Sequence, residues 1–167
     1  GEVRARKDEF EGQLAALEAE QAALAAVVSR GSGTPPASRG GGRFVWPCDG
    51  RVASRFGYRV HPISGTSRMH TGVDLGCGYG APIGAAGDGV VVEAGWRGGY
   101  GNAVVIDHGD GLATLYGHQS SIAVSPGERV STGRTIGYVG STGYSTGPHL
   151  HWEVWVNGTP VDPMGYV

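Results

Sequence analysis

The chain has 167 residues, of which 40% are hydrophobic, and it contains 32 glycines and nine prolines but only three phenylalanines. This length supports one globular core with an appendage, and so many turn-forming residues favour short strands, which predicts an all-β fold. The formal net charge of −2 argues against nucleic acid or an anionic membrane as the main partner, since both favour a basic patch.

Residues 1–28 carry the pattern of an amphipathic helix. The seam positions of a heptad repeat are occupied by Val3, Phe10, Leu14, Leu17, Leu24 and Val28, with Lys7 and Gln21 at the two remaining ones. Alanine and glutamate, both good helix formers, fill most other positions. An isolated helix is marginal in water, so the stripe predicts a coiled-coil-like arm with a helical partner, or self-association, through residues 3–28. The alternative is a helix packed on its own domain.

Residues 29–43 show no apolar period and are rich in glycine, serine and proline, which predicts a flexible linker with an r.m.s. span of about 20 Å. The globular domain is then expected to cover residues 44–167. No apolar run reaches the ~20 residues of a membrane-spanning helix, and the first residues lack the apolar core of a signal peptide. The chain starts without Met, so we expect any export signal or anchor to lie upstream.

Within the domain, apolar runs bounded by glycines predict strands at residues 90–94, 103–107 and 112–116, with further strands around 134–139 and 149–156. The segment 107–111, Asp-His-Gly-Asp-Gly, carries the Asp-Gly signal of a tight hairpin turn. No helical period follows residue 43. The sequence therefore predicts an antiparallel sheet or sandwich.

Two histidines one residue apart begin the last predicted strand. Side chains two apart in a strand share a face, so His149 and His151 would project together while Leu150 and Trp152 point towards a core. The alternative is two unrelated polar positions on a half-exposed strand. Whether the pair forms a site depends on partners elsewhere in the chain.

Other histidines and an aspartate are candidate partners of the His149 and His151 pair. His70 precedes Asp74 by four residues, and together with His151 this pair would supply the three nitrogen and oxygen ligands of a catalytic zinc that keeps one open position. His118 lies at the end of a predicted strand, and this fourth histidine favours the interpretation of His70, Asp74 and His151 as a catalytic site. His61 and His108 are expected to be solvated or structural, and the His-x-x-x-Asp spacing alone also fits an ordinary polar turn.

The chain resembles a known family at these positions. His70-x-x-x-Asp74, the tripeptide at 116–118 and the run at 147–153 are similar to motifs of the lysostaphin-type zinc endopeptidases that act on bacterial peptidoglycan. Segments 56–63, 99–102 and 140–148 extend the resemblance over about residues 44–167.

The resemblance implies one zinc ion per domain, bound by His70, Asp74 and His151. It implies His118 and His149 as the catalytic pair, which acts on water, the oxyanion and the leaving amine. Tyr100 and Asn102 match family positions near the substrate groove, where a role in loop structure is an equal alternative.

The two cysteines, Cys48 and Cys77, are the remaining candidates. In an exported protein an even count permits one disulfide, which would tie the start of the domain to the His70–Asp74 loop. Buried free thiols and a thiolate metal ligand at Cys77 are the alternatives.

These observations predict an exported zinc endopeptidase of the cell envelope or extracellular space, which hydrolyses peptide bonds in peptidoglycan cross-links or stem peptides. An alternative class is a non-catalytic wall-binding or amidase-activating regulator with a coiled-coil interaction arm, although such proteins usually lack metal ligands. A structural zinc site is a further alternative, but it would close all four positions with protein ligands and would not need His118.

Overall fold

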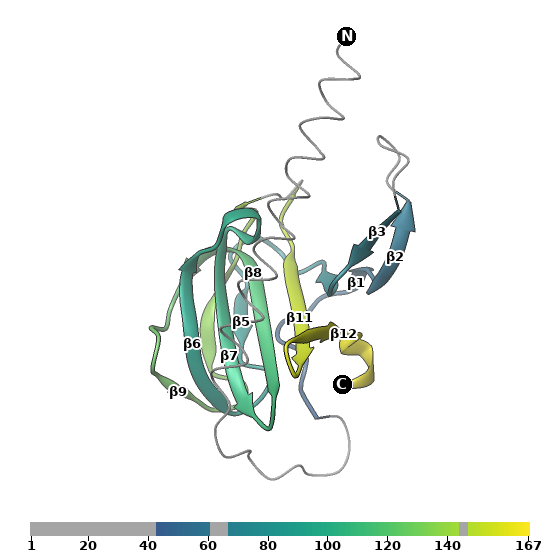
Figure 1. The fold of residues 1–167 in the computed structure, drawn as a ribbon. Coiled ribbons are helices and arrows are strands. Elements are labelled where there is room, and N and C mark those ends of the chain that lie inside the picture. Colours follow the sequence, from purple (N-terminus) through teal and green to yellow (C-terminus); the bar gives the residue numbers. More distant parts are fainter. Residues whose placement is uncertain (1–42, 61–66, 144–146) are drawn as a thin grey trace.

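The computed structural model describes residues 43–60, 67–143 and 147–167, which form an all-β domain (Figure 1). The predicted arm at residues 1–28, residues 29–42 of the predicted linker, and His61 lie outside the described residues. The division into arm, linker and domain therefore stays a prediction. In the part of the chain that is described, no helix is long and apolar enough to cross a membrane.

The described residues contain twelve strands and two short 3-10 helices. In chain order these are β1 (Val52–Ser54), β2 (Gly57–Val60), β3 (Ser67–His70), β4 (Val73–Leu75), β5 (Pro82–Gly84), β6 (Gly89–Trp96), η1 (Gly98–Tyr100), β7 (Asn102–Gly109), β8 (Leu112–Ile122), β9 (Arg129–Val130), β10 (Thr135–Val139), β11 (Leu150–Val156), β12 (Thr159–Val161) and η2 (Pro163–Gly165).

Most strands belong to one large sheet, in which β1, β4, β11, β8, β7, β6 and β9 are neighbours in this order. Strand β10 pairs with both β8 and β5, β12 pairs with β11, and β2 and β3 form a separate two-stranded sheet. Figure 1 shows β6, β7, β8 and β11 side by side as the broad face of the domain. All these pairings are antiparallel, which confirms the predicted antiparallel all-β class.

The longer predicted strands are confirmed within a few residues, as β6, β7, β8, β10 and β11. The hairpin between β7 and β8 turns at Asp110 and Gly111, whose φ angles of 56° and 76° match the left-handed conformation that Asp-Gly accommodates. The prediction placed His108 in that turn, whereas it lies in β7 and is 2% exposed, so its role is structural.

Strand β11 shows the expected alternation. Leu150, Trp152 and Val154 are fully buried in the main core, to which β5 contributes Ile83 and β10 contributes Ile136. The opposite face carries His151, followed by Glu153 and Trp155. One face of β11 therefore packs in the main core, and the other carries the polar residues His151 and Glu153 beside a second buried cluster that includes Trp155.

His108 takes part in a series of buried hydrogen bonds next to the core. Its Nδ1 lies 2.8 Å from the carbonyl of Asp88, so Nδ1 donates, and its Nε2 lies 2.7 Å from the hydroxyl of Thr114, which in turn lies 2.8 Å from the Tyr116 hydroxyl. Burial lowers the pKa of His108 to about 4 from its ordinary 6.5. The ring is thus neutral in the folded protein at neutral pH.

We expect His108 to destabilise the domain in acid. Between pH 6.5 and pH 4 the unfolded chain binds a proton at this histidine that the folded chain does not. The free energy of unfolding is therefore highest above pH 6.5 and falls as the pH is lowered, by about 3 kcal/mol for this shift in pKa. Urea unfolding of the parent and of His108→Gln across this range measures the effect as the difference between their slopes. Parallel pH profiles for the two proteins would contradict it.

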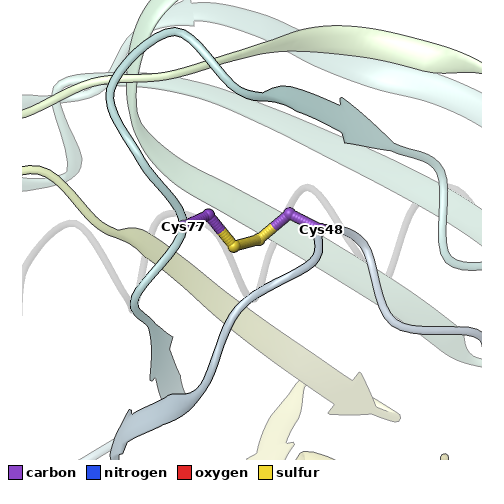
Figure 2. The surroundings of a disulfide bond; sticks show 2 residues. All are labelled: Cys48 and Cys77. Carbon is purple, nitrogen blue, oxygen red and sulfur yellow. A yellow bond between two sulfur atoms is a disulfide. The ribbon is translucent and has the colours of Figure 1, made fainter.

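The predicted disulfide is present. Cys48 and Cys77 are bonded across a sequence separation of 29 residues, and they join the start of the domain to the segment that follows β4 (Figure 2). No cysteine among the described residues is free, so the free-thiol and thiolate-ligand alternatives are excluded. The bond holds the chain three residues beyond Asp74 of β4.

The disulfide should stabilise the domain measurably. Closing a loop of this length removes unfolded-state entropy equivalent to about 3–4 kcal/mol. We expect the Cys48→Ala/Cys77→Ala double variant to lose that order of unfolding free energy in urea titrations, and we expect almost no titratable thiol in the denatured, unreduced parent. Equal stability of parent and double variant would contradict the expectation.

Candidate metal centre

Three potential metal ligands converge from three strands. His70 ends β3, Asp74 lies in β4, and His151 lies in β11, directly opposite Asp74 in the β4–β11 register. One ligand atom from each residue lies within 4.8 Å of the other two. The structure thus brings together the predicted set of two imidazoles and one carboxylate.

Hydrogen bonds orient both imidazoles of this set. The Nδ1 of His70 donates to the carbonyl of Arg55 at 2.8 Å, which leaves its Nε2 facing Asp74 Oδ2 at 3.4 Å. The ring of His151 is turned the other way, with Nε2 2.7 Å from Glu153 Oε2 and Nδ1 2.8 Å from Asp74 Oδ1. The open nitrogens are therefore Nε2 of His70 and Nδ1 of His151, and both point at Asp74.

Two further imidazoles complete the cluster. The ring of His118 lies 4.9 Å from that of His149 and 5.9 Å from that of His151, measured between centroids. Nδ1 of His118 donates to the carbonyl of Thr142 at 2.6 Å, and Nδ1 of His149 donates to the carbonyl of Gly147 at 2.9 Å. Both Nε2 atoms are left unprotonated when these rings are neutral, and that of His149 lies 3.6 Å from Asp74 Oδ1.

A backbone irregularity places His118 in the cluster. Regular alternation after Tyr116, which faces the main core, would turn His118 towards that core as well. Instead the β7–β8 register shifts between Val104–Tyr116 and Asn102–Gln119, and His118 has a φ of 61°. Such a bulge re-aims a side chain, here towards the metal ligands.

The local electrostatics suit a cation. Burial opposes ionisation of Asp74, but its hydrogen bonds with His151 and His70 outweigh burial and hold its pKa well below the usual range. In the metal-free protein, hydrogen bonds to Asp74 and Glu153 overcome the effect of burial on His151 and raise its pKa to about 10. A metal ion would thus replace a proton on His151, so binding competes with protonation.

The two remaining site predictions, Tyr100 and Asn102, lie beside the cluster. Tyr100 is 2% exposed, and its hydroxyl donates to Glu153 Oε2 at 2.8 Å. The Asn102 side-chain amide donates to the carbonyl of Gln119 at 3.1 Å, and its backbone N–H donates to Thr142 Oγ1 at 3.1 Å. Both residues brace loops here, and their contact with substrate stays a prediction.

The loop after β10, whose Thr142 carbonyl accepts a hydrogen bond from His118, packs against the loop at η1. Gly101 and Gly143 have φ angles of 65° and 76°, and a Cβ on Gly143 would lie 2.9 Å from the Cα of Gly101. Side chains do not fit at so close an approach. The Thr142 carbonyl, which accepts this hydrogen bond from His118 Nδ1, is therefore fixed by backbone packing.

Some functional residues were not predicted. Glu153 accepts a hydrogen bond from Nε2 of His151, and the carbonyls of Arg55, Thr142 and Gly147 accept hydrogen bonds from the other rings. Glu153 could have been found, because it lies two residues after His151 on the same face of a strand. The carbonyls could not, since any residue type supplies one.

Several known proteins that are similar to this chain are peptidases. The model of peptidase family M23 matches residues 68–163. The DD-carboxypeptidase/endopeptidase Mpg of Neisseria meningitidis is 53% identical over 114 residues, which cover 68% of this chain and 26% of Mpg. The chain thus spans about a quarter of the length of that relative.

Two solved structures share the fold. A zinc-containing peptidase from Vibrio cholerae superposes with a TM-score of 0.69 at 39% identity, covering 71% of this chain and 38% of that one. The catalytic domain of lysostaphin from Staphylococcus simulans gives a TM-score of 0.61 at 40% identity, covering 70% of this chain and 90% of that one. The expected resemblance to lysostaphin-type enzymes is therefore confirmed.

The ligand assignment predicts which substitutions release a metal. We expect about one zinc per domain in the parent, and a loss of it in Asp74→Ala and His151→Ala, because each removes one of three ligands and weakens binding steeply. Elemental analysis after dialysis against trace chelator measures it, with His108→Gln as a histidine substitution outside the cluster. Stoichiometric zinc in both ligand variants would refute the assignment.

Proposed function

The chain belongs to peptidase family M23, and we propose that it is a zinc-dependent endopeptidase that hydrolyses peptide bonds in peptidoglycan cross-links or stem peptides. The observation that carries the proposal is a three-ligand cluster flanked by two histidines that are not needed as ligands. A structural zinc site would take a fourth protein ligand, and a binding module would have no use for His118 and His149 beside the ligands.

The donor set fits zinc. Two imidazole nitrogens and one carboxylate are typical of catalytic zinc sites, and the anchored rings present their free nitrogens to one point. When bound, zinc would polarise the scissile carbonyl and lower the pKa of a water molecule. His70, Asp74 and His151 would hold the ion.

The two other histidines have the geometry for proton transfer. Burial, followed by the charge of His151, lowers the pKa of His118 to about 4, so its Nε2 is a free acceptor at neutral pH. His149, the residue just before β11, presents Nε2 next to Asp74. Either ring can accept the proton of an attacking water at Nε2, and the other, when doubly protonated, can deliver its Nε2 proton to the leaving amine. The Thr142 and Gly147 carbonyls keep both rings in place.

The substrate class is inferred from the family. The resemblance to lysostaphin-type members of family M23 implies peptidoglycan, and this chain shares the fold of the lysostaphin catalytic domain. The disulfide supports an extracellular or envelope location, because such bonds persist in oxidising compartments. One bound zinc per domain completes the proposal.

The test separates a catalyst from a regulator. We expect the zinc-loaded parent to release new amino termini from chemically defined cross-linked muropeptides, with the bond identified by mass spectrometry. His118→Ala and His149→Ala should each keep zinc and fold while turnover drops by ~10²-fold or more, which is the usual worth of general acid–base catalysis. Binding to the wall polymer should change little, because proton transfer matters mainly in the transition state.

The control is His108→Gln, which should cleave like the parent at neutral pH because His108 lies in the core, away from the metal ligands. A parent that holds zinc, binds the polymer and releases no amine from any cross-link type would favour the non-catalytic regulator. Loss of zinc in His118→Ala would show instead that His118 is a ligand.

A further inference from the structure

A fully buried carboxylate lies behind the metal ligands. Glu153 is 0% exposed, and four side chains donate hydrogen bonds to it. Its Oε2 accepts from His151 Nε2 at 2.7 Å, from the Thr71 hydroxyl at 2.7 Å and from the Tyr100 hydroxyl at 2.8 Å, while Oε1 accepts from Trp155 Nε1 at 2.7 Å. Both oxygens thus have protein donors, three at Oε2 and one at Oε1.

This arrangement is not what stability alone favours. A carboxylate in an apolar interior is expensive to bury, and apolar side chains of similar volume often replace buried charges without loss. Apart from the donor groups, its neighbours are largely apolar, since its register partner Leu115 and the rings of Tyr100 and Trp155 belong to one buried hydrophobic cluster. The position therefore points to a task that an apolar residue cannot perform.

The three donors to Oε2 come from segments that meet at the metal site. His151 is itself a ligand, and Thr71 directly follows the ligand His70. Tyr100 belongs to η1, and its ring lies 5.8 Å from that of His151. The backbone at Gly72 approaches closely as well, because a Cβ there would lie 2.8 Å from Glu153 Cγ. One oxygen atom thus joins the segments that carry both histidine ligands.

We propose that Glu153 is a positioning residue for the metal: its Oε2 holds the His151 ring with Nδ1 towards Asp74 and ties the end of β3, through Thr71, to the same point. The proposal rests on the proposed zinc site and concerns its affinity rather than the reaction. It requires an acceptor oxygen at the Oε2 position. A glutamine can supply that oxygen, although its NH2 group then faces the Trp155 Nε1–H donor and lowers stability, whereas a methionine supplies no oxygen.

The expected pattern separates this role from a general contribution to folding. Glu153→Met should weaken zinc binding by ~10- to 100-fold, the usual effect of losing an outer partner of a ligand, while Glu153→Gln should stay within about three-fold of the parent. Trp155→Phe removes the bond to Oε1 alone, so it should lose stability but keep zinc affinity. Competition with a chromophoric zinc chelator measures affinity, and urea unfolding of the zinc-free proteins measures stability.

Two outcomes would overturn the proposal. Unchanged zinc affinity in a folded Glu153→Met protein would show that the acceptor is not required. A loss of affinity that follows the loss of stability across all three variants, Trp155→Phe included, would reduce Glu153 to a structural residue.

A second route covers the case in which Glu153→Met does not fold. The Thr71→Val/Tyr100→Phe double variant keeps the carboxylate but removes two of the three donors to Oε2, and we expect several-fold weaker zinc binding in a folded protein. The ring ¹⁵N spectrum of His151 in the zinc-loaded parent should show a proton on Nε2. Unaltered affinity of the double variant, or a His151 ring that exchanges between tautomers, would contradict the proposal.

These results are distinguishable from failure of the proposed function. A parent that binds no zinc removes the function and the positioning role together. A parent that binds zinc and cleaves muropeptides, alongside a Glu153→Met protein that binds zinc equally well, removes the positioning role alone.

Discussion

The pairing of Asp74 with His151 across β4 and β11 is the contact on which the rest of the site depends. The two residues are directly opposite in the strand register, and Asp74 Oδ1 lies 2.8 Å from His151 Nδ1. A slip of one residue would turn every side chain of β11 to the other face. Leu150 and Trp152, both fully buried on the core face, make such a slip costly. Hydrophobic packing behind the sheet therefore fixes the geometry of the polar cluster in front of it.

The disulfide acts on the same contact. Strand β4 is only three residues long, Val73–Leu75, too short for its own pairing to fix it firmly. It lies between β1 and β11, and Cys77, two residues past its end, is bonded to Cys48. The strand that carries Asp74 is thus held by neighbours on both sides and by a covalent bond beyond its end.

The sequence predicts those parts of the site that follow from regular geometry. The period of two in a strand places His149 and His151 on one face, and the long strands β6, β7, β8 and β11 are recognisable as apolar runs between glycines. Strands β1 to β5 are missed, because they have three or four residues each and their stability comes from their partners and not from a local pattern. Likewise, His118 reaches the site through a bulge at a positive φ, which an alternation rule assigns to the wrong face.

The anchoring of the rings explains how the fold by itself assembles the histidine cluster. In each of four rings, one nitrogen donates a hydrogen bond to a protein acceptor and the other faces a common space. These rings belong to His70, His118, His149 and His151. Since the acceptors are backbone carbonyls or the buried carboxylate of Glu153, no ring needs to reorient when an ion or a substrate binds. The desolvation of these groups is offset during folding, by hydrogen bonds in a low-dielectric interior where such bonds are strong. The orientation of the ring nitrogens is therefore set by folding. A metal ion that bound here would not have to order its ligands, unlike in small domains that fold only around their zinc.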